Sequence, residues 1–197
     1  MMLEAVASQV LWTWLAFFGM PAGNNDLNIL NQSPIFYDHM NGVGPKGSFF
    51  FVKDVEYKYG YYLTDDIYPD WAVFVKSFTR EMKLDEKRRK FNGTQMARKD
   101  IERAFGVLQS RWHILKVSCR IMEKISIRNV MYACVILHNM ILEDDGRAIC
   151  EYYEETSQPS IVELSDEEKE ANLNEIKHDT THHNLRANLV EHILSVP

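Results

Sequence analysis

The spacing of apolar residues changes once along this chain, near residue 70, and that change limits the fold more than any other feature. Before it, the segments "MLEAVAS", "VLWTWLAFF" and "SFFFVKDVEYKYGYYLTDD" are rich in aromatic and β-branched residues and are bounded by turn residues, as strands are. After it, apolar residues recur every three or four positions, which is typical of helices that bury one face. Strands followed by helices predict an α/β or α+β layered domain, and we expect the α/β class, with helices that flank a mixed sheet.

The strand half is expected to contain two pairs of strands. The first pair turns near Ser8 and Gln9. The second pair turns near Lys53 and Asp54, and Gly60 interrupts its second strand.

The helical half is expected to begin with a helix that carries Trp71, Val75 and Phe78, followed by a loop over the basic segment "KLDEKRRKFNGTQ". The clearest helix is "RKDIERAFGVLQSRW", residues 98–112. It and the residues just after it carry one apolar stripe, formed by Ile101, Phe105, Leu108, Trp112 and Leu115.

Further helices are expected towards the end of the chain. Ser126 is expected to cap a core helix in "IRNVMYACVILHNMILEDD", and a short helix is expected from Asp166. Leu185 and Leu189 belong to the apolar stripe of a last helix, which is expected to dock onto the body of the protein. We therefore predict a domain over residues 1–145, an acidic linker or tail over 146–177 and a C-terminal helix over 178–197.

Charge is strongly segregated along the chain. Residues 76–128 carry 15 basic and 6 acidic side chains, whereas both flanks are acidic. Such a block indicates a surface that meets phosphates, although a solvated basic helix gives the same count. The three cysteines form no CxxC pair, and the longest apolar run is too short to span a bilayer. We therefore expect a reducing compartment and no membrane partner.

Three acidic residues stand at special places in the predicted structure. Asp26 lies in the first turn of a helix expected after the second strand, Asp65 lies just past the strand in "GYYL", and Glu102 lies on the helix over 98–112. Carboxylates brought together from a strand end and neighbouring helices form phosphoryl-transfer sites, because Mg²⁺ prefers oxygen ligands. Two such ions, about 3.5–4 Å apart, activate a water and stabilise the leaving oxygen of a phosphodiester.

Each of these residues also has a simpler explanation. Asp26 can cap a helix, and Asp65 can belong to a turn. Glu102 can be a solvated residue that pairs with Arg98 or Arg103. Among the histidines, His178, His182 and His183 are expected to be a solvated cluster rather than a metal site, and His138 a satisfied core side chain.

Several segments together resemble a known family. "GNNDLNIL", "QSPIF", "YYLTDDIYP", "RKDIERAFGVLQSRW" and "ACVILHNMILEDD" are similar, in order and spacing, to the blocks of the PIF/Harbinger transposases, including their plant transposon-protein branch and their domesticated nuclease-like relatives. The resemblance implies an incomplete RNase H-like DDE domain, DNA as substrate, Mg²⁺ or Mn²⁺ as cofactor, a nuclear location and a Myb-like accessory protein. It also implies roles for single residues. The matched positions are Asp26, Asp65 and Glu102 as metal ligands, Asp65 and Glu102 as catalytic residues, and Arg98, Lys99 and Arg103 as contacts to nucleic acid.

The chain also departs from the pattern of that family. A further aspartate of the family stands on a first core strand that precedes the equivalent of residue 2, so we expect this strand to be missing, together with a helical DNA-binding region. Asp66 replaces a glycine, and Met96 stands where glutamate is common. We expect the chain by itself to have little or no nuclease or strand-transfer activity.

Three functions stay open at this point. The chain can be a metal-dependent transposase-type nuclease that is completed by a partner or by further sequence. It can be a remnant that binds DNA or protein without catalysis, in which case DNA retention depends on salt and no cleavage occurs. It can also be a decayed fragment, which would fail to fold cooperatively.

Overall fold

The computed structural model describes residues 3–18, 30, 32–41, 49–79, 85–117, 123–146 and 164–195. The chain divides into two compact units, each built from two separate stretches of sequence. Unit 1 comprises residues 1–33 and 99–157, and unit 2 comprises residues 34–98 and 158–197. The described residues form helices and three two-stranded ladders, so the predicted α/β class is confirmed at that level.

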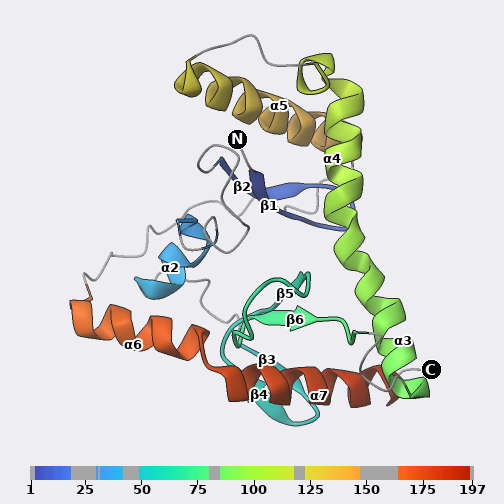
Figure 1. Ribbon diagram of the computed structural model, residues 1–197, viewed down its shortest axis with the longest axis vertical. Helices are drawn as coiled ribbons and strands as arrows, with labels where there is room; N and C mark the ends of the chain where they lie inside the picture. The colour runs from blue at the N-terminus through green and yellow to red at the C-terminus, as the bar shows by residue number, and fades with distance from the viewer. Residues whose placement is uncertain are drawn as a thin grey trace. The chain divides into compact units, whose positions relative to one another are not determined.

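Unit 1 contains the first predicted hairpin, formed by β1 (Leu3–Ala7) and β2 (Thr13–Phe18) (Figure 1). The antiparallel register pairs Leu3 with Phe18, Ala5 with Ala16 and Val6 with Leu15. In the turn, the Ser8 N–H donates to the Trp12 carbonyl at 3.0 Å. Leu11 has a φ of 68°, a left-handed conformation that is unfavourable for a side chain with a Cβ. Contacts from the rest of unit 1 must therefore hold this turn.

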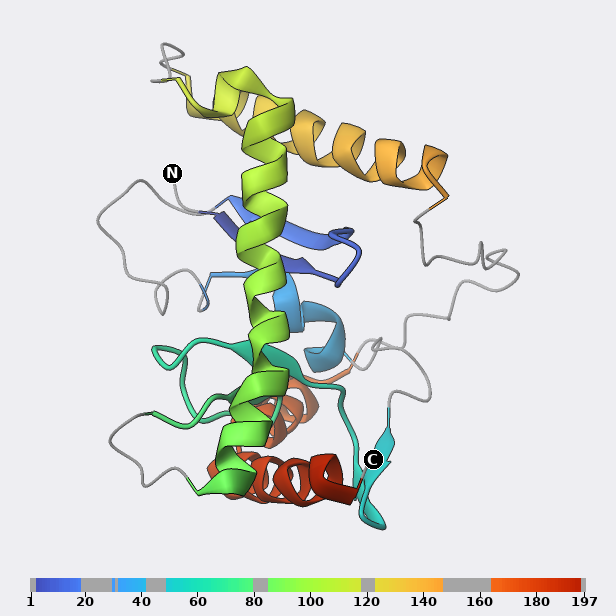
Figure 2. The same cartoon turned by 90° about the vertical axis from the view of Figure 1, so that its right-hand side faces the viewer.

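Two helices cover the hairpin, with α4 (Asp100–Arg111) against β1 and α5 (Lys124–Asp144) against β2 (Figures 1 and 2). A short turn of 3-10 helix, η3 (His113–Leu115), lies between them in sequence. Phe18 meets Tyr132 of α5 edge to face, with ring centroids 4.8 Å apart. The helix predicted from the apolar stripe of residues 98–112 is confirmed as α4, which buries Leu108.

The fully buried His138 ties α5 to the hairpin turn. Its Nε2–H donates to the Leu11 carbonyl at 2.8 Å, and its Nδ1 lies 2.9 Å from Nη1 of Arg111. Because a guanidinium can only donate, Nδ1 must accept, and His138 is neutral. Burial lowers the pKa of His138, and the charge of Arg111 lowers it further. The Asn139 side chain donates to the Thr13 carbonyl at 2.8 Å and accepts from the Thr13 N–H at 3.0 Å. The prediction of a satisfied core histidine is confirmed.

Unit 2 contains the other strands. β3 (Phe50–Val52) and β4 (Val55–Tyr57) form an antiparallel hairpin, and β5 (Tyr62–Thr64) pairs in parallel with β6 (Phe74–Lys76). The hairpin turn falls at Lys53 and Asp54 as predicted, with φ values of 51° and 63°, the left-handed pair that a two-residue turn requires. The segment 48–66 holds three strands rather than the predicted two, because the residues around Gly60 separate β4 from β5.

Helices pack around these strands. The helical elements of unit 2 are η1 (Pro34–Phe36), α2 (Tyr37–Met40), α3 (Glu86–Thr94), α6 (Asp166–Ile176) and α7 (Asp179–Ser195), and η2 (Gln95–Lys99) ends at the boundary with unit 1. α7 contacts α3, β3 and β6, so the predicted docking of the last helix is confirmed (Figure 1). The core of the unit consists of Val52, Tyr57, Val75, Phe91, Leu185, Leu189 and Val190. The helix predicted from Asp166 is also confirmed, and it starts with a reciprocal cap between Ser165 and Glu168.

The helix predicted around Trp71, Val75 and Phe78 is wrong, because β6 occupies this segment. Val73, Phe74 and Val75 are all buried, with exposed fractions of 2%, 2% and 0%. A short strand that is covered on both faces produces such a continuous apolar run, and the run also contains the spacing of a helix.

The loop predicted over residues 83–95 is also wrong, because α3 lies there. Asp85 caps the helix by accepting a hydrogen bond from the Arg88 N–H at 2.8 Å. Phe91 is fully buried, and the side chain of Asn92 bonds to both backbone polar groups of Phe78. The buried Phe91 and the capping Asp85 therefore stabilise α3, although four of its nine residues are basic.

Two predictions for α5 are corrected. The helix begins at Lys124, so Ser126 lies inside its first turn, where its hydroxyl donates to Glu123 at 2.6 Å. The helix is also less buried than a core element: Ile136 and Met140 are 58% and 55% exposed.

Candidate functional site

Asp65 stands directly after β5, at the carboxyl end of the parallel strand pair, as the sequence predicts. Its Oδ1 accepts hydrogen bonds from the Asp66 N–H at 3.0 Å and from Nη1 of Arg98 at 2.5 Å. The side chain of Asp65 is 65% exposed and that of Arg98 is 31% exposed. Two predicted site residues of unit 2 are therefore in direct contact, as a solvent-accessible ion pair.

The charge state of Asp65 follows from these contacts. Partial burial raises the pKa of Asp65, but the hydrogen bonds from the Asp66 N–H and from Arg98 outweigh it and lower the pKa overall. Asp65 is therefore ionised at neutral pH, which is the state that a divalent cation requires.

Glu102 lies in the first turn of α4, in unit 1, and its side chain is exposed. A carboxylate in this position stabilises the positive end of the helix dipole. Lys99 is exposed as well, and Arg103 bonds to the nearly buried Asp100 at 2.5 Å. Asp65 belongs to unit 2, and Asp26 lies outside the residues that the structure describes, so the convergence of the three predicted carboxylates stays a prediction.

The fit of these residues to a metal ion is partial. Asp65 offers the hard oxygen donors that Mg²⁺ and Mn²⁺ prefer. The hydrogen bonds from Asp66 and Arg98 both end on Oδ1, and the guanidinium of Arg98 stands where a cation would bind that atom. Within the described stretches, no group of three or more His, Cys, Asp or Glu side chains is placed to hold a metal ion. In unit 2, Asp65 can therefore act as one carboxylate ligand, in competition with Arg98.

Unit 2 holds a second charged cluster that the sequence reasoning missed. Asp70 bonds to Lys76 at 2.5 Å, and this hydrogen bond is the main cause of its lowered pKa. The fully buried His182 donates from Nδ1 to the Phe74 carbonyl at 2.7 Å, and its Nε2 lies 3.6 Å from Oδ1 of Asp70. The prediction of a solvated histidine cluster is therefore wrong for His182. One signal in the sequence could have indicated that His182 is buried: it stands three residues before Leu185, so it lies on the apolar stripe of the last helix.

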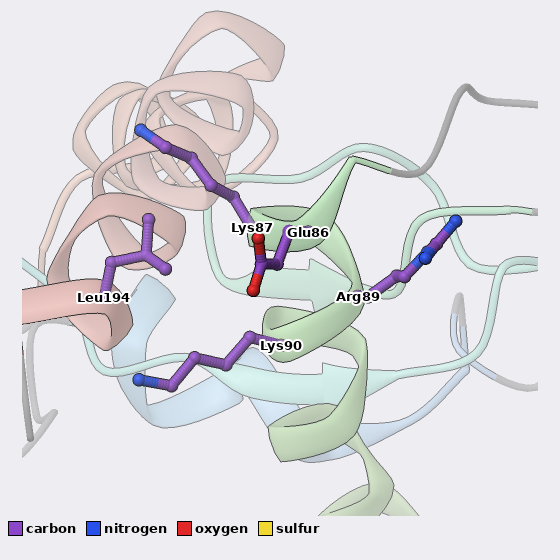
Figure 3. A pocket seen from close by; sticks show the side chains of 5 residues that line it. All are labelled: Glu86, Lys87, Arg89, Lys90 and Leu194. Atoms are coloured by element: carbon purple, nitrogen blue, oxygen red, sulfur yellow. The ribbon is translucent and has the colours of Figure 1, made fainter.

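Basic side chains gather at the first turns of α3. Lys87, Arg89 and Lys90 line a pocket of about 700 Å³ with Glu86 and with Leu194 of α7 (Figure 3). Figure 3 shows Lys87 and Lys90 reaching to the side of Leu194, whereas Arg89 extends away from it. Lys87 also bonds to Glu191 at 2.9 Å. The basic block found in the sequence is thus displayed, in part, by one helix.

The comparison with known proteins agrees with the sequence blocks. A model of the plant transposon protein family matches residues 1–149, which include Asp26, Asp65 and Glu102. Neither the curated proteins nor the solved structures give a significant match. Because the matched segment spans most of the 197 residues, the chain belongs to the plant transposon protein family.

Proposed function

We propose that the chain is a Harbinger-type transposase-derived protein with the remains of an RNase H-like DDE site, in which Asp26, Asp65 and Glu102 bind Mg²⁺ or Mn²⁺ against DNA. The site would belong to an endonuclease and strand-transfer enzyme, with Asp65 and Glu102 as its catalytic carboxylates. Membership of the transposon family supports this proposal. The observation that carries it is the carboxylate of Asp65 at the end of β5, which is ionised and accepts a hydrogen bond from the guanidinium of Arg98.

The chain by itself is proposed to have little or no nuclease activity. The guanidinium of Arg98 already neutralises Asp65, so a metal ion must displace it before binding Oδ1. A bound divalent ion would supply the charge that stabilises a leaving phosphate oxygen. Lys99 and Arg103 are exposed cations on the neighbouring sequence that suit phosphate contacts.

Metal binding and cleavage are tested separately. Mn²⁺ added to the labelled full chain should broaden the amide signals of residues 64–66 weakly, and Asp65→Asn should remove this effect. A plasmid-nicking assay with Mg²⁺ or Mn²⁺ should detect no cleavage above that of Glu102→Gln. Robust cleavage that disappears in Glu102→Gln would refute the proposed inactivity, and unaffected signals at 64–66 would refute the metal site.

A second candidate function is DNA or protein binding without catalysis. The basic turns of α3, with Lys87, Arg89 and Lys90 around one pocket, favour it. On duplex DNA, the removal of one cation that binds a phosphate should reduce the slope of log K against log salt by about 0.9. Arg89→Gln/Lys90→Gln should therefore flatten the slope by up to about two, whereas the charge-matched control Lys169→Gln/Lys177→Gln on and after α6 should leave it unchanged. An equal effect of both variants would indicate only a nonspecific effect of net charge.

The location and the partner follow from the family proposal alone. A tagged full chain should accumulate in the nucleus, and a Myb-like accessory protein should increase that accumulation. An even distribution with and without the accessory protein would count against both.

A further inference from the structure

The ring of Phe78 is held in place beside α3 and α7, which contact each other in unit 2 (Figure 1). The side chain of Asn92 bonds to both the N–H and the carbonyl of Phe78 at 2.8 Å. The ring also meets the fully buried ring of Phe91 edge to face, with centroids 5.4 Å apart. Phe78 is therefore fixed through its backbone and its ring, and it can serve as a platform for other side chains.

Two arginine side chains lie over this ring. The guanidinium carbon of Arg88, on α3, is 5.0 Å from the ring centre, and that of Arg186, on α7, is 4.7 Å from it. The two guanidinium carbons therefore cannot be farther apart than the sum of these two distances. A guanidinium is attracted to the face of an aromatic ring, but two guanidiniums repel each other. An anion that contacts both of them would remove this repulsion.

Arg186 is half-buried, yet its guanidinium has no ion pair or hydrogen bond among the described residues. Lys87, one residue before Arg88 on α3, differs in this respect, because it bonds to Glu191 at 2.9 Å. A guanidinium that stacks on a ring through its face keeps its N–H donors at its edge, in the plane of the group. These donors fit two oxygens of one phosphate, which makes a phosphate group a suitable ligand.

The surrounding charges leave this pair of arginines positive. Burial is the main cause of the lowered pKa of Arg186, and the charge of Arg88 lowers that pKa as well. The carboxylates of Asp70 and Asp66 act in the opposite direction. Asp70 already bonds to Lys76 at 2.5 Å, so Asp66 remains to oppose the two guanidiniums.

We propose that Arg88 and Arg186 form a clamp for a phosphate group of the DNA backbone, with the ring of Phe78 as its base. The proposal rests on the DNA binding proposed above for α3. It adds Arg186, a residue of α7 outside the family match over residues 1–149. Since the charge of Asp66 reaches Arg186 and Asp66 adjoins Asp65, the bound phosphate lies near the end of β5.

A polymer of phosphates fits this surface better than a single phosphate ion does. Lys87, Arg89 and Lys90 lie on the same turns of α3 as Arg88 and line one pocket. One free phosphate would use the clamp alone, whereas a DNA backbone presents several phosphates in a row to these cations.

Fluorescence anisotropy of a labelled DNA duplex, measured with the full chain at several salt concentrations, tests the clamp. Arg186→Gln should weaken binding about 3- to 10-fold and reduce the slope of log K against log salt by about 0.9, and Arg88→Gln should do the same. The matched control is Lys177→Gln, which removes a cation that also lies over a ring, 5.3 Å from the centre of Trp71, but without a second cation. Binding by the control should be unchanged. Equal losses in Arg186→Gln and Lys177→Gln overturn the clamp.

A change in the opposite direction separates phosphate binding from a role in folding. Asp66→Asn removes the carboxylate that opposes the clamp, so it should strengthen DNA binding roughly 1.5- to 5-fold. Glu56→Gln, at an exposed position of β4, removes the same charge and should leave binding unchanged. Unchanged binding in Asp66→Asn, or an equal gain in Glu56→Gln, overturns the proposal. Far-UV circular dichroism shows whether each variant has kept its helices.

The arginine side-chain signals test the clamp independently of DNA binding. In the ¹⁵N-arginine-labelled full chain, the Nε–Hε signals of Arg88 and Arg186 should shift when inorganic phosphate replaces chloride at equal ionic strength. The signal of Arg98 should shift less, because Arg98 is already bonded to Asp65. A chain that binds no duplex refutes the proposed DNA binding, and the phosphate response then decides the clamp. Unchanged signals of Arg88 and Arg186 overturn it.

Discussion

Removing the guanidinium of Arg98 should raise the pKa of Asp65 by a small, measurable amount. The pair is partly solvated, with Asp65 65% and Arg98 31% exposed, so its energy is that of a surface pair, about 0.2–1 kcal/mol. Arg98→Gln should therefore raise the pKa of Asp65 by the amount that corresponds to the loss of this surface-pair energy. The hydrogen bond from the Asp66 N–H persists and keeps the pKa from rising further.

The assay is a carboxyl ¹³C titration of Asp65 in the labelled full chain. Arg103→Gln is the matched control, because its guanidinium bonds to Asp100 rather than to Asp65. With the competing guanidinium removed, the affinity of Mn²⁺ at Asp65 should increase by up to about fivefold, read as line broadening at residues 64–66. An unchanged pKa of Asp65 in Arg98→Gln, or an equal rise in Arg103→Gln, would refute the assignment of Arg98 as its counter-ion.

Three further changes probe the body of the protein. Phe91→Ala should destabilise unit 2 by about 3–5 kcal/mol in chemical denaturation, because removal of this fully buried ring leaves a cavity among the core residues; a decrease below about 1 kcal/mol would contradict that packing. Asp85→Ala should cost about 1 kcal/mol by removing the cap of α3, whereas Asp85→Asn should retain most of it. Burial lowers the pKa of His182 below its unfolded value of about 6.5, so above that pH both states are neutral and stability is full. As the pH falls through that value, the unfolded chain binds the proton first and stability decreases; hydrogen exchange of α7 amides should report this decrease in the wild type but not in His182→Gln.

The elements that could be predicted from the sequence were those with one dominant local signal. The apolar stripe through Phe105 and Leu108 identified α4, and the aromatic segments around a polar turn identified β1 and β2. The position of Asp65 at a strand end followed in the same way, from the turn residues after "YYL".

The errors occurred where tertiary contacts decide between two local patterns. Residues 73–75 are covered on both sides, and a run buried in that way contains helical and extended spacings alike. The basic composition of α3 suggested a loop, because the contribution of Phe91 depends on residues of α7 nearly a hundred positions later. The exposed face of α5 could not be predicted either. The segment is apolar on most sides of the helix, so its sequence alone does not indicate which side packs against another element.

Unit 2 is formed by two stretches of sequence that are far apart, residues 34–98 and 158–197, and this separation determines when the unit can fold during synthesis. β3, β6 and α3 leave the ribosome long before α7, which brings Leu185, Leu189 and Val190 to the core around Phe91. Until α7 is made, the nascent chain exposes the apolar core residues that were synthesised earlier, such as Val75 and Phe91. Exposed apolar side chains of this kind favour aggregation and chaperone binding. Folding of this unit is therefore expected only after α7 has been synthesised, and a chain that ended with the family match at residue 149 would lack the helix that completes the core.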